Sequence, residues 1–390
     1  MKLSDRITDI TRGGDDGWGV FYKARKLIAE GEDILELTIG EHDIRTDLSI
    51  LNAMHGSARG GNTGYAAVPG SQALREEIAS RVEARTGVST SFRNIIVTPG
   101  GQAALFAAHI AVLNPGDKAL YLDPYYATYP GTIRGVGGMD TPVVTLPSNA
   151  FQPTREELEA AAPGARSLLI NTPNNPTGVV YFRETIEMIS DVVKAHDIWL
   201  ISDEVYDTQI WEGEHVSPRR IDGMAERTLV VGSMSKSHAM TGSRVGWIVA
   251  PESVVPHLIN LSTNTTYGVP GFIQDAALFA LRQGKALEAE IAAPFERRRR
   301  LARSLLEGQK HVKLVPSGGA MYLMLDIRST GLSGKDFALS LLNHEKIAVM
   351  PGESFGQAAA GHIRVAMTID DERFVAALKR LLDFAGRLTA

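Results

Sequence analysis

Six short apolar runs recur along the 390-residue chain, and they constrain its fold more than any other feature. They comprise residues 94–97, 119–122, 167–170, 198–201, 228–231 and 246–249. Each run is apolar at consecutive positions, which is typical of strands that are buried on both faces of a sheet. Helical patterns such as residues 183–196 lie between them. The alternation predicts an α/β fold, with a three-layer α/β/α large domain around a mostly parallel sheet.

The pattern changes after about residue 285, where we expect a smaller α+β domain. A basic helical segment is followed by strand-like and helical segments at residues 320–326, 335–345, 347–350 and 371–388. The first 45 residues lack the strand–helix alternation, so we predict that residues 1–45 join residues 286–390 in the small domain and that residues 46–285 form the large one. We interpret the run Arg297 to Arg300 as a solvated helix face.

Composition excludes several classes of function. The chain has no cysteine, which rules out disulfides, thiolate metal sites and a cysteine nucleophile, and we expect no metal site. A net charge of −5 argues against nucleic-acid binding. No stretch approaches the roughly 18 apolar residues of a membrane span, and the N-terminus does not resemble a signal peptide. We therefore expect a cytoplasmic protein without membrane or nucleic-acid partners.

Polar segments rich in glycine or proline follow five of the apolar runs. They are residues 98–102, 123–126, 171–178, 202–206 and 232–236. Ligands of open α/β sheets bind outside the carboxyl ends of the strands. One such segment would be ordinary loop composition, but five together predict a single site.

Lys236 follows one of these strands in a serine-rich segment. A lysine that is partly desolvated and close to other positive charge can act as an amine nucleophile. The alternative on this segment alone is a surface lysine.

An anion site is predicted around Ser233, Ser235 and Arg244, because hydroxyl groups and a guanidinium suit a phosphate. Gly101 and Gln102 open a helical segment, where free backbone N–H groups can bind an anion. The alternative for the glycines is a turn that only needs flexible residues.

Asp203 follows a buried strand, where an unpaired carboxylate is costly, so it needs a cationic partner such as a protonated pyridine nitrogen. Tyr206 is close enough in sequence to reach the same pocket. Asn175 can donate its amide to a ring oxygen, and Tyr126 offers an aromatic face for stacking. These residues predict a site for a cationic aromatic ring.

Four motifs together resemble the class I/II aminotransferases of fold type I, the aspartate aminotransferase superfamily. The motifs are Asn-Pro-Thr-Gly at 175–178, Asp-Glu-Val-Tyr at 203–206, Ser-Met-Ser-Lys at 233–236 with Gly-Ser-Arg-Val-Gly at 242–246, and His-Ile-Arg-Val at 362–365. The resemblance extends from about residue 19 to the C-terminus.

The resemblance implies pyridoxal 5'-phosphate (PLP) as the cofactor. Lys236 would form the aldimine with it and shuttle the substrate proton, and Asp203 would keep the pyridine nitrogen protonated. Asn175 and Tyr206 would hydrogen-bond the ring oxygen, while Tyr126 would stack on the ring. Together, Gly101, Gln102, Ser233, Ser235 and Arg244 would hold the phosphate.

Arg364 would clamp the substrate α-carboxylate beside Asn175, unless it forms a surface ion pair. Tyr65 would reach the phosphate of the neighbouring subunit, unless it is a core or interface aromatic, which implies a homodimer with shared active sites. Relatives commonly have Gly-x-Pro-Asp-Phe where this chain has Gly40-Glu-His-Asp-Ile44. We therefore expect Ile39, Gly40 and His42 to shape an unusual substrate pocket.

The predicted activity is transfer of an amino group from an L-amino acid to a 2-oxo acid. Some aspartate-specific relatives have lysine where this chain has Gln102, so the expected donor is neutral or aromatic, with aspartate or glutamate as the alternative. A carbon–sulfur β-lyase or a related PLP lyase shares the same residues and stays open. The effector-binding half of a transcription regulator is disfavoured, because that architecture needs a DNA-binding domain. A nucleotide-binding protein is disfavoured too, because its usual glycine motifs do not follow the first strand.

Overall fold

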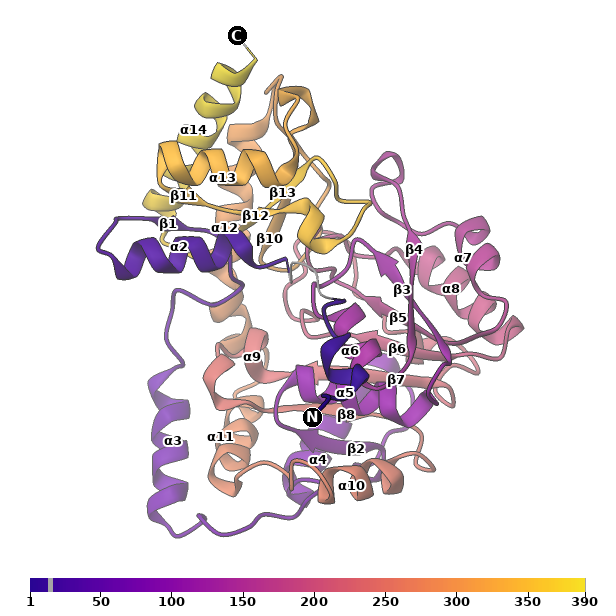
Figure 1. The fold of residues 1–390 in the computed structure, drawn as a ribbon. Helices are drawn as coiled ribbons and strands as arrows, with labels where there is room; N and C mark the ends of the chain where they lie inside the picture. Colours follow the sequence, from indigo (N-terminus) through magenta and orange to yellow (C-terminus); the bar gives the residue numbers. More distant parts are fainter. Residues whose placement is uncertain (13–16, 390) are drawn as a thin grey trace.

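A seven-stranded sheet forms the centre of the molecule in the computed structural model, which describes residues 1–12 and 17–389 (Figure 1). Its strand order is β2-β8-β7-β6-β5-β3-β4. The strands are β2 (Ile95–Thr98), β3 (Lys118–Asp123), β4 (Met139–Val144), β5 (Ala165–Asn171), β6 (Trp199–Asp203), β7 (Thr228–Ser233) and β8 (Gly246–Val249). Strands β3 to β7 are parallel, and β8 is antiparallel to both of its neighbours. The prediction of a mostly parallel sheet is confirmed.

Helices cover both faces of this sheet. They are α3 (Leu48–Arg59), α4 (Gln72–Thr86), α5 (Gly101–Val112), α6 (Tyr129–Gly135), α7 (Arg155–Ala161), α8 (Arg183–Ala195), α9 (Met234–Ser237), α10 (Val255–Thr263) and α11 (Gly271–Arg282). Consecutive residues of a strand point to opposite faces. Leu168 accordingly packs with α7 and α8, and Leu169 packs with α5 and α6. This alternation explains why the strands are apolar at every position, and it confirms the three-layer architecture.

A smaller α+β unit lies above the large sheet (Figure 1). Its four-stranded sheet has the order β12-β13-β10-β9, and β1 pairs separately with β11. The elements are β1 (Leu35–Glu36), β9 (Lys313–Leu314), β10 (Tyr322–Asp326), β11 (Ile347–Ala348), β12 (Met350–Pro351), β13 (His362–Ala366), α2 (Gly19–Ala29), α12 (Lys285–Leu306), α13 (Gly334–Glu345) and α14 (Asp371–Leu388). The helices expected at 335–345 and 371–388 are present.

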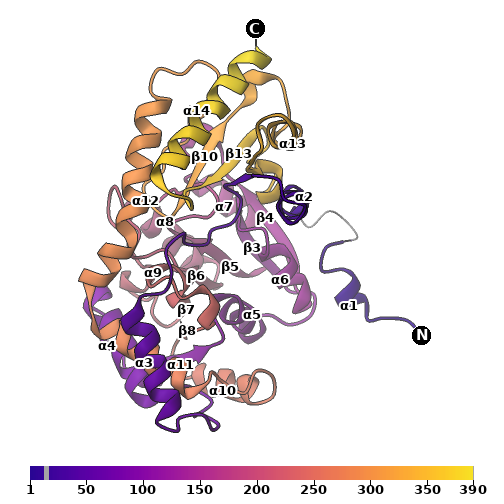
Figure 2. The same ribbon diagram turned by 90° about the vertical axis from the view of Figure 1, so that its left-hand side faces the viewer.

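The N-terminal residues divide between the two units. Helix α2 and strand β1 pack on the smaller unit, whereas α1 (Asp5–Thr8) lies against α6 of the larger one (Figures 1 and 2). Arg134 of α6 donates to the carbonyl of Ile10 at 2.9 Å. The division of the chain into residues 46–285 and residues 1–45 with 286–390 stays a prediction. Within the described ranges, none of the helices combines the length and apolar character that a bilayer span requires.

The expectation that residues 297–300 form a solvated face is wrong for two of the four arginines. Arg298 and Arg299 are only 3% and 4% exposed. Arg298 binds Asp43 at 2.6 Å and Asp371 at 2.8 Å, so it ties residues from both ends of the chain to α12. A helix turns by about 100° per residue, so four consecutive side chains cannot all face solvent when the helix packs on a core.

Substitution Arg298→Met should destabilise the protein by about 2–4 kcal/mol, because the partly buried carboxylate of Asp43 loses its cation and that of Asp371 keeps only Arg297. The matched change Arg300→Met, at an exposed position on the same helix, should cost less than about 0.5 kcal/mol. Urea unfolding of both variants measures the difference. Equal losses of stability would contradict the structural role of Arg298.

Candidate active site

A cavity of about 290 Å³ collects every predicted site residue except Tyr65 and His42. The predicted residues that line it are Gly40, Gly101, Gln102, Tyr126, Asn175, Asp203, Tyr206, Ser233, Ser235, Lys236, Arg244 and Arg364. Most of them follow strands of the large sheet, and Arg364 belongs to β13 of the small sheet. The convergence of strand ends therefore produces one site, as the sequence predicted.

Lys236 lies in the short helix α9, directly after β7. Ser233 caps this helix, with its hydroxyl accepting from the N–H of Ser235 at 3.1 Å. The Lys236 ammonium donates to the carbonyl of Gly40. Burial lowers the pKa of Lys236; the neighbouring Arg364 lowers it further. The alternative of a surface lysine is wrong, and the charged form of the amine is less stable in the cavity than in solvent.

Asp203 ends β6 and is 4% exposed. Its carboxylate accepts from the hydroxyl of Tyr129 at 2.7 Å and from the N–H of Val205 at 3.3 Å, and both donors are neutral. Burial raises the pKa of Asp203 to about 6. A cationic group in the cavity would offset the cost of burying the charged carboxylate and would lower its pKa. Sequence reasoning missed Tyr129, which opens α6 three residues beyond Tyr126 and outside the strand-end segment 123–126.

Arg364 is 1% exposed, so the alternative of a surface ion pair is wrong. Its guanidinium donates to the side-chain oxygen of Asn175 at 2.9 Å and also to the carbonyl of Thr38. The rings of Tyr322 and Phe355 lie 4.5 and 4.4 Å from the guanidinium carbon. Burial lowers the pKa of Arg364 from its ordinary value. Two aromatic rings thus hold a bidentate donor at the cavity wall, where it can bind a carboxylate.

The predicted phosphate cradle lies at the N-terminus of α5. Gly100 caps this helix with φ of 83°, and a Cβ atom there would lie 2.3 Å from the Arg244 guanidinium. Glycine therefore lets the arginine approach the helix N-terminus closely. The hydroxyls of Ser233 and Ser235 lie 3.0 Å apart at the same end of the cavity. This set of donors suits a dianion.

Gln102 contributes to the cradle differently from its neighbours. Its side-chain amide donates to Thr132 at 2.8 Å and accepts from Thr128 at 3.0 Å. The side chain is therefore held by α6 and the turn before it. Its backbone N–H, in the first turn of α5, is the group suited to an anion.

His42 does not shape the cavity as we expected, although Ile39 and Gly40 do line it. The His42 ring lies 3.0 Å from the carbonyl of Lys236 and packs edge-on against Phe295. Burial lowers the pKa of His42 to about 4, so the ring is neutral. His42 supports the backbone of Lys236 from behind.

Tyr65 lies outside the cavity of its own chain. It is 93% exposed, and its ring packs edge-on against Tyr267 with centroids 5.2 Å apart. The alternative of a core aromatic is wrong. Its contact with a neighbouring subunit stays a prediction.

Comparison with known proteins identifies the family. Residues 32–381 match the family described as aminotransferase class I and II. The chain is 39% identical to the arginine–pyruvate transaminase of Pseudomonas aeruginosa, over 100% of this chain and 99% of the relative. It is 36% identical to the aspartate/prephenate aminotransferase of Thermus thermophilus, over 94% of both chains. The structure of Thermus thermophilus aspartate aminotransferase with maleate superposes with a TM-score of 0.92, at 35% identity and 100% coverage of both chains.

The chain belongs to the class I and II aminotransferases. It is a PLP-dependent aminotransferase that acts on amino acids and 2-oxo acids. The fold class and the cofactor predicted from the sequence are confirmed, and the relatives do not favour the lyase alternative.

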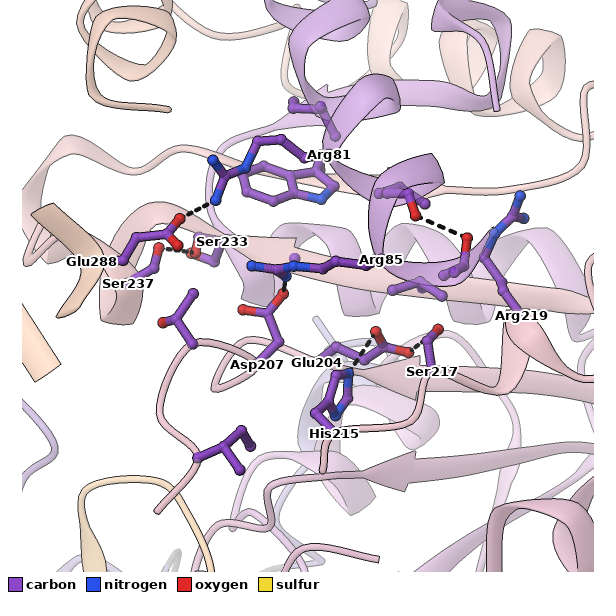
Figure 3. A pocket seen from close by; sticks show the side chains of 18 of the residues that line it. Arg81, Arg85, Glu204, Asp207, His215, Ser217, Arg219, Ser233, Ser237 and Glu288 are labelled. Atoms are coloured by element: carbon purple, nitrogen blue, oxygen red, sulfur yellow. Dashed lines mark hydrogen bonds and ion pairs between the residues drawn. The ribbon is translucent and has the colours of Figure 1, made fainter. Parts of the chain in front are cut away.

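A second cavity, of about 340 Å³, is drawn in Figure 3, and Ser233 lines both this cavity and the active site. Two ion pairs line it: Arg81 binds Glu288 and Arg85 binds Asp207. The buried carboxylate of Glu204 lies 3.1 Å from His215.

Burial alone would raise the pKa of Glu204. Hydrogen bonds from His215, Ser217 and Ser202 outweigh that effect and hold the pKa below its usual value. Glu204 follows Asp203 directly, so this charged network supports the rear of the catalytic segment.

Substitution His215→Ala should cost about 1–3 kcal/mol of stability, because Glu204 stays buried with only its serine donors. The control is His196→Ala, whose partner Glu159 is 41% exposed. Exposed pairs contribute little, so that change should cost less than about 1 kcal/mol. Chemical denaturation of both variants decides, and similar losses would refute a supporting role for His215.

Asp203→Asn should stabilise the cofactor-free protein at pH 7.5 by about 1–3 kcal/mol. The folded pKa of about 6 exceeds the ordinary value of 3.8, so the contribution of Asp203 to stability is present below pH 3.8 and is lost as pH rises through about 6. Asparagine removes that loss, and the gain should shrink at pH 4.5. Asp47→Asn is the control, because hydrogen bonds from Ser49 hold its pKa low and no gain is expected. A gain that is equal at both pH values would contradict the assignment.

Proposed function

We propose that Lys236 is the amine that binds PLP and that Asp203 pairs with the ring nitrogen. The supporting observation is the arrangement of one cavity, in which a buried carboxylate with neutral donors lies near a lysine whose pKa is lowered by burial. PLP supplies an electron sink that stabilises negative charge at the substrate Cα.

The residues fit this cofactor chemically. Asp203 offers a negative charge to a protonated ring nitrogen, Tyr126 offers an aromatic face, and Tyr206 offers a hydroxyl. In the same cavity, Arg244, Ser233 and the N-terminus of α5 offer donors to the phosphate. The carboxylate, the aromatic face and the anion-binding donors thus match the ring nitrogen, the ring and the phosphate of the cofactor.

Lys236 is also the proposed proton carrier. An amine with a lowered pKa is neutral more often at physiological pH, which allows it to accept the Cα proton of the substrate. Its contact with the Gly40 carbonyl holds the amine within the cavity. Arg364 binds the substrate carboxylate, and Asn175 orients the guanidinium through the hydrogen bond between them.

We propose a homodimer in which Tyr65 completes the site of the partner. Its ring is 93% exposed beside Tyr267, itself 52% exposed. An apolar groove between α5 and α10 is bordered by Phe106 and Ile110, which are 41% and 37% exposed. A second copy of the chain would cover these side chains. A cytoplasmic location stays a prediction that cell fractionation would test.

The proposed donor is a neutral or aromatic L-amino acid, with aspartate or glutamate as the alternative. Gln102 supports a donor without a distal carboxylate, because its amide is engaged by two threonines and carries no charge. Arginine belongs in the test set as well, since Glu41 lines the cavity and the relative in Pseudomonas aeruginosa is an arginine–pyruvate transaminase.

Absorption spectra of the PLP-loaded protein test this function directly. A yellow band that moves to the near-ultraviolet with one amino acid, and returns with a 2-oxo acid, would identify donor and acceptor. Lys236→Ala should reduce the conversion rate more than about 100-fold, whereas Lys194→Ala at the surface should leave it unchanged. Unchanged conversion by Lys236→Ala would refute the role of Lys236. Accumulation of pyruvate and ammonia without any acceptor would instead indicate a lyase.

A further inference from the structure

Tyr322 is a buried tyrosine that none of the sequence motifs includes. It opens β10 in the four-stranded sheet, is 2% exposed and lines the active-site cavity. Asp203 ends β6 and Lys236 follows β7, both of the seven-stranded sheet. Tyr322 therefore reaches the reaction centre from the opposite side.

The Tyr322 hydroxyl meets three parts of the site. It lies 2.9 Å from the hydroxyl of Tyr206, and the Arg364 guanidinium covers its ring at 4.5 Å. A Cβ atom on Gly40 would lie 1.7 Å from the hydroxyl oxygen. The absence of a side chain at Gly40 thus gives the phenol the space it occupies.

The neighbouring charges determine which hydroxyl donates. Either oxygen could donate by geometry alone. Arg364, which lies close enough to interact electrostatically with Tyr322 and covers its ring, carries donors only. The Tyr322 hydrogen therefore has the Tyr206 oxygen as its acceptor, which leaves the Tyr206 hydrogen directed into the cavity.

We propose that Tyr322 is a positioning residue for the reaction: it donates to Tyr206 and thereby makes Tyr206 a fixed and stronger donor toward the anionic ring oxygen of the cofactor. Hydrogen bonds in a chain polarise one another, so a hydroxyl that accepts one bond donates the next more strongly. The proposal rests on the proposed function, which places the ring oxygen near Tyr206.

The test is Tyr322→Phe, which keeps the ring against Arg364 and removes only the hydroxyl. A donor aimed at an anionic oxygen favours the deprotonated form of the bound cofactor, so a weaker donor should raise the pH midpoint of the visible absorption band by about 0.3–1 unit. The dissociation constant for PLP, measured by fluorescence quenching, should rise about 2- to 10-fold. Tyr181→Phe, a buried tyrosine outside the cavity, should leave both values unchanged.

A double-variant cycle separates this role from general packing. Tyr206→Phe should raise the midpoint more than Tyr322→Phe does, and the double variant should match Tyr206→Phe alone. Gly40→Ala displaces the Tyr322 hydroxyl without removing it, so it should shift the pH midpoint in the same direction. This variant tests the role of the Tyr322 hydroxyl if Tyr322→Phe does not fold. Additive shifts, or a wild-type midpoint in Tyr322→Phe, would overturn the proposal.

The outcomes also distinguish this role from the proposed function. A wild-type protein that gains no visible band with PLP would overturn both. A wild-type protein that loads PLP and converts amino acids, alongside an unaltered Tyr322→Phe, would overturn the role of Tyr322 only.

Discussion

Removal of charged groups from water is the constraint on which this site depends. Burial raises the pKa of Asp203 and lowers the pKa of both Lys236 and Arg364, so each charged form is less stable in the cavity than in solvent. Each of these costs falls when a group of complementary charge binds. The ring nitrogen of PLP would complement Asp203, and a substrate carboxylate would complement Arg364. The protein thus retains electrostatic strain that binding relieves, which is a common cost of an active site.

The segments that present the catalytic residues face two cavities. Asp203, Tyr206 and Lys236 point into the active site, while the residues that follow them, Glu204, Asp207 and Ser237, line the chamber drawn in Figure 3. The chamber carboxylates are paired with His215 and Arg85. These carboxylates have ion-pair partners within the chain, whereas Asp203, Lys236 and Arg364 are hydrogen-bonded only to neutral groups. The chamber consequently fixes the backbone of the segments, and the active site keeps its charges available for ligands.

The sequence predicts the strands and the residues at their ends, because apolar runs and polar strand ends are local signals. It does not reveal β4, since this edge strand contains Pro142 and has a single buried residue, Val143. Tyr129, Tyr322 and Phe355 were also missed, because a tyrosine or phenylalanine in an apolar segment has the same local signature whether it faces a core or a cavity. The burial of Arg298 depends on partners 255 and 73 residues away, so no local pattern could predict it.

One short segment joins the two sides of the site, and it explains why the unusual sequence at residues 40–44 is tolerated. Thr38 accepts from Arg364 and Gly40 accepts from Lys236, in both cases through backbone carbonyls. His42 then contacts the Lys236 carbonyl, so every second residue of the segment engages the site. Backbone carbonyls are the same in every amino acid, and contacts of this kind survive changes of side chain. Gly40 is the exception, because the Tyr322 hydroxyl fills the space where a side chain would lie. The backbone contacts of Thr38 and Gly40 leave the side chains of the segment free to vary, whereas a side chain at position 40 would have to displace the Tyr322 hydroxyl.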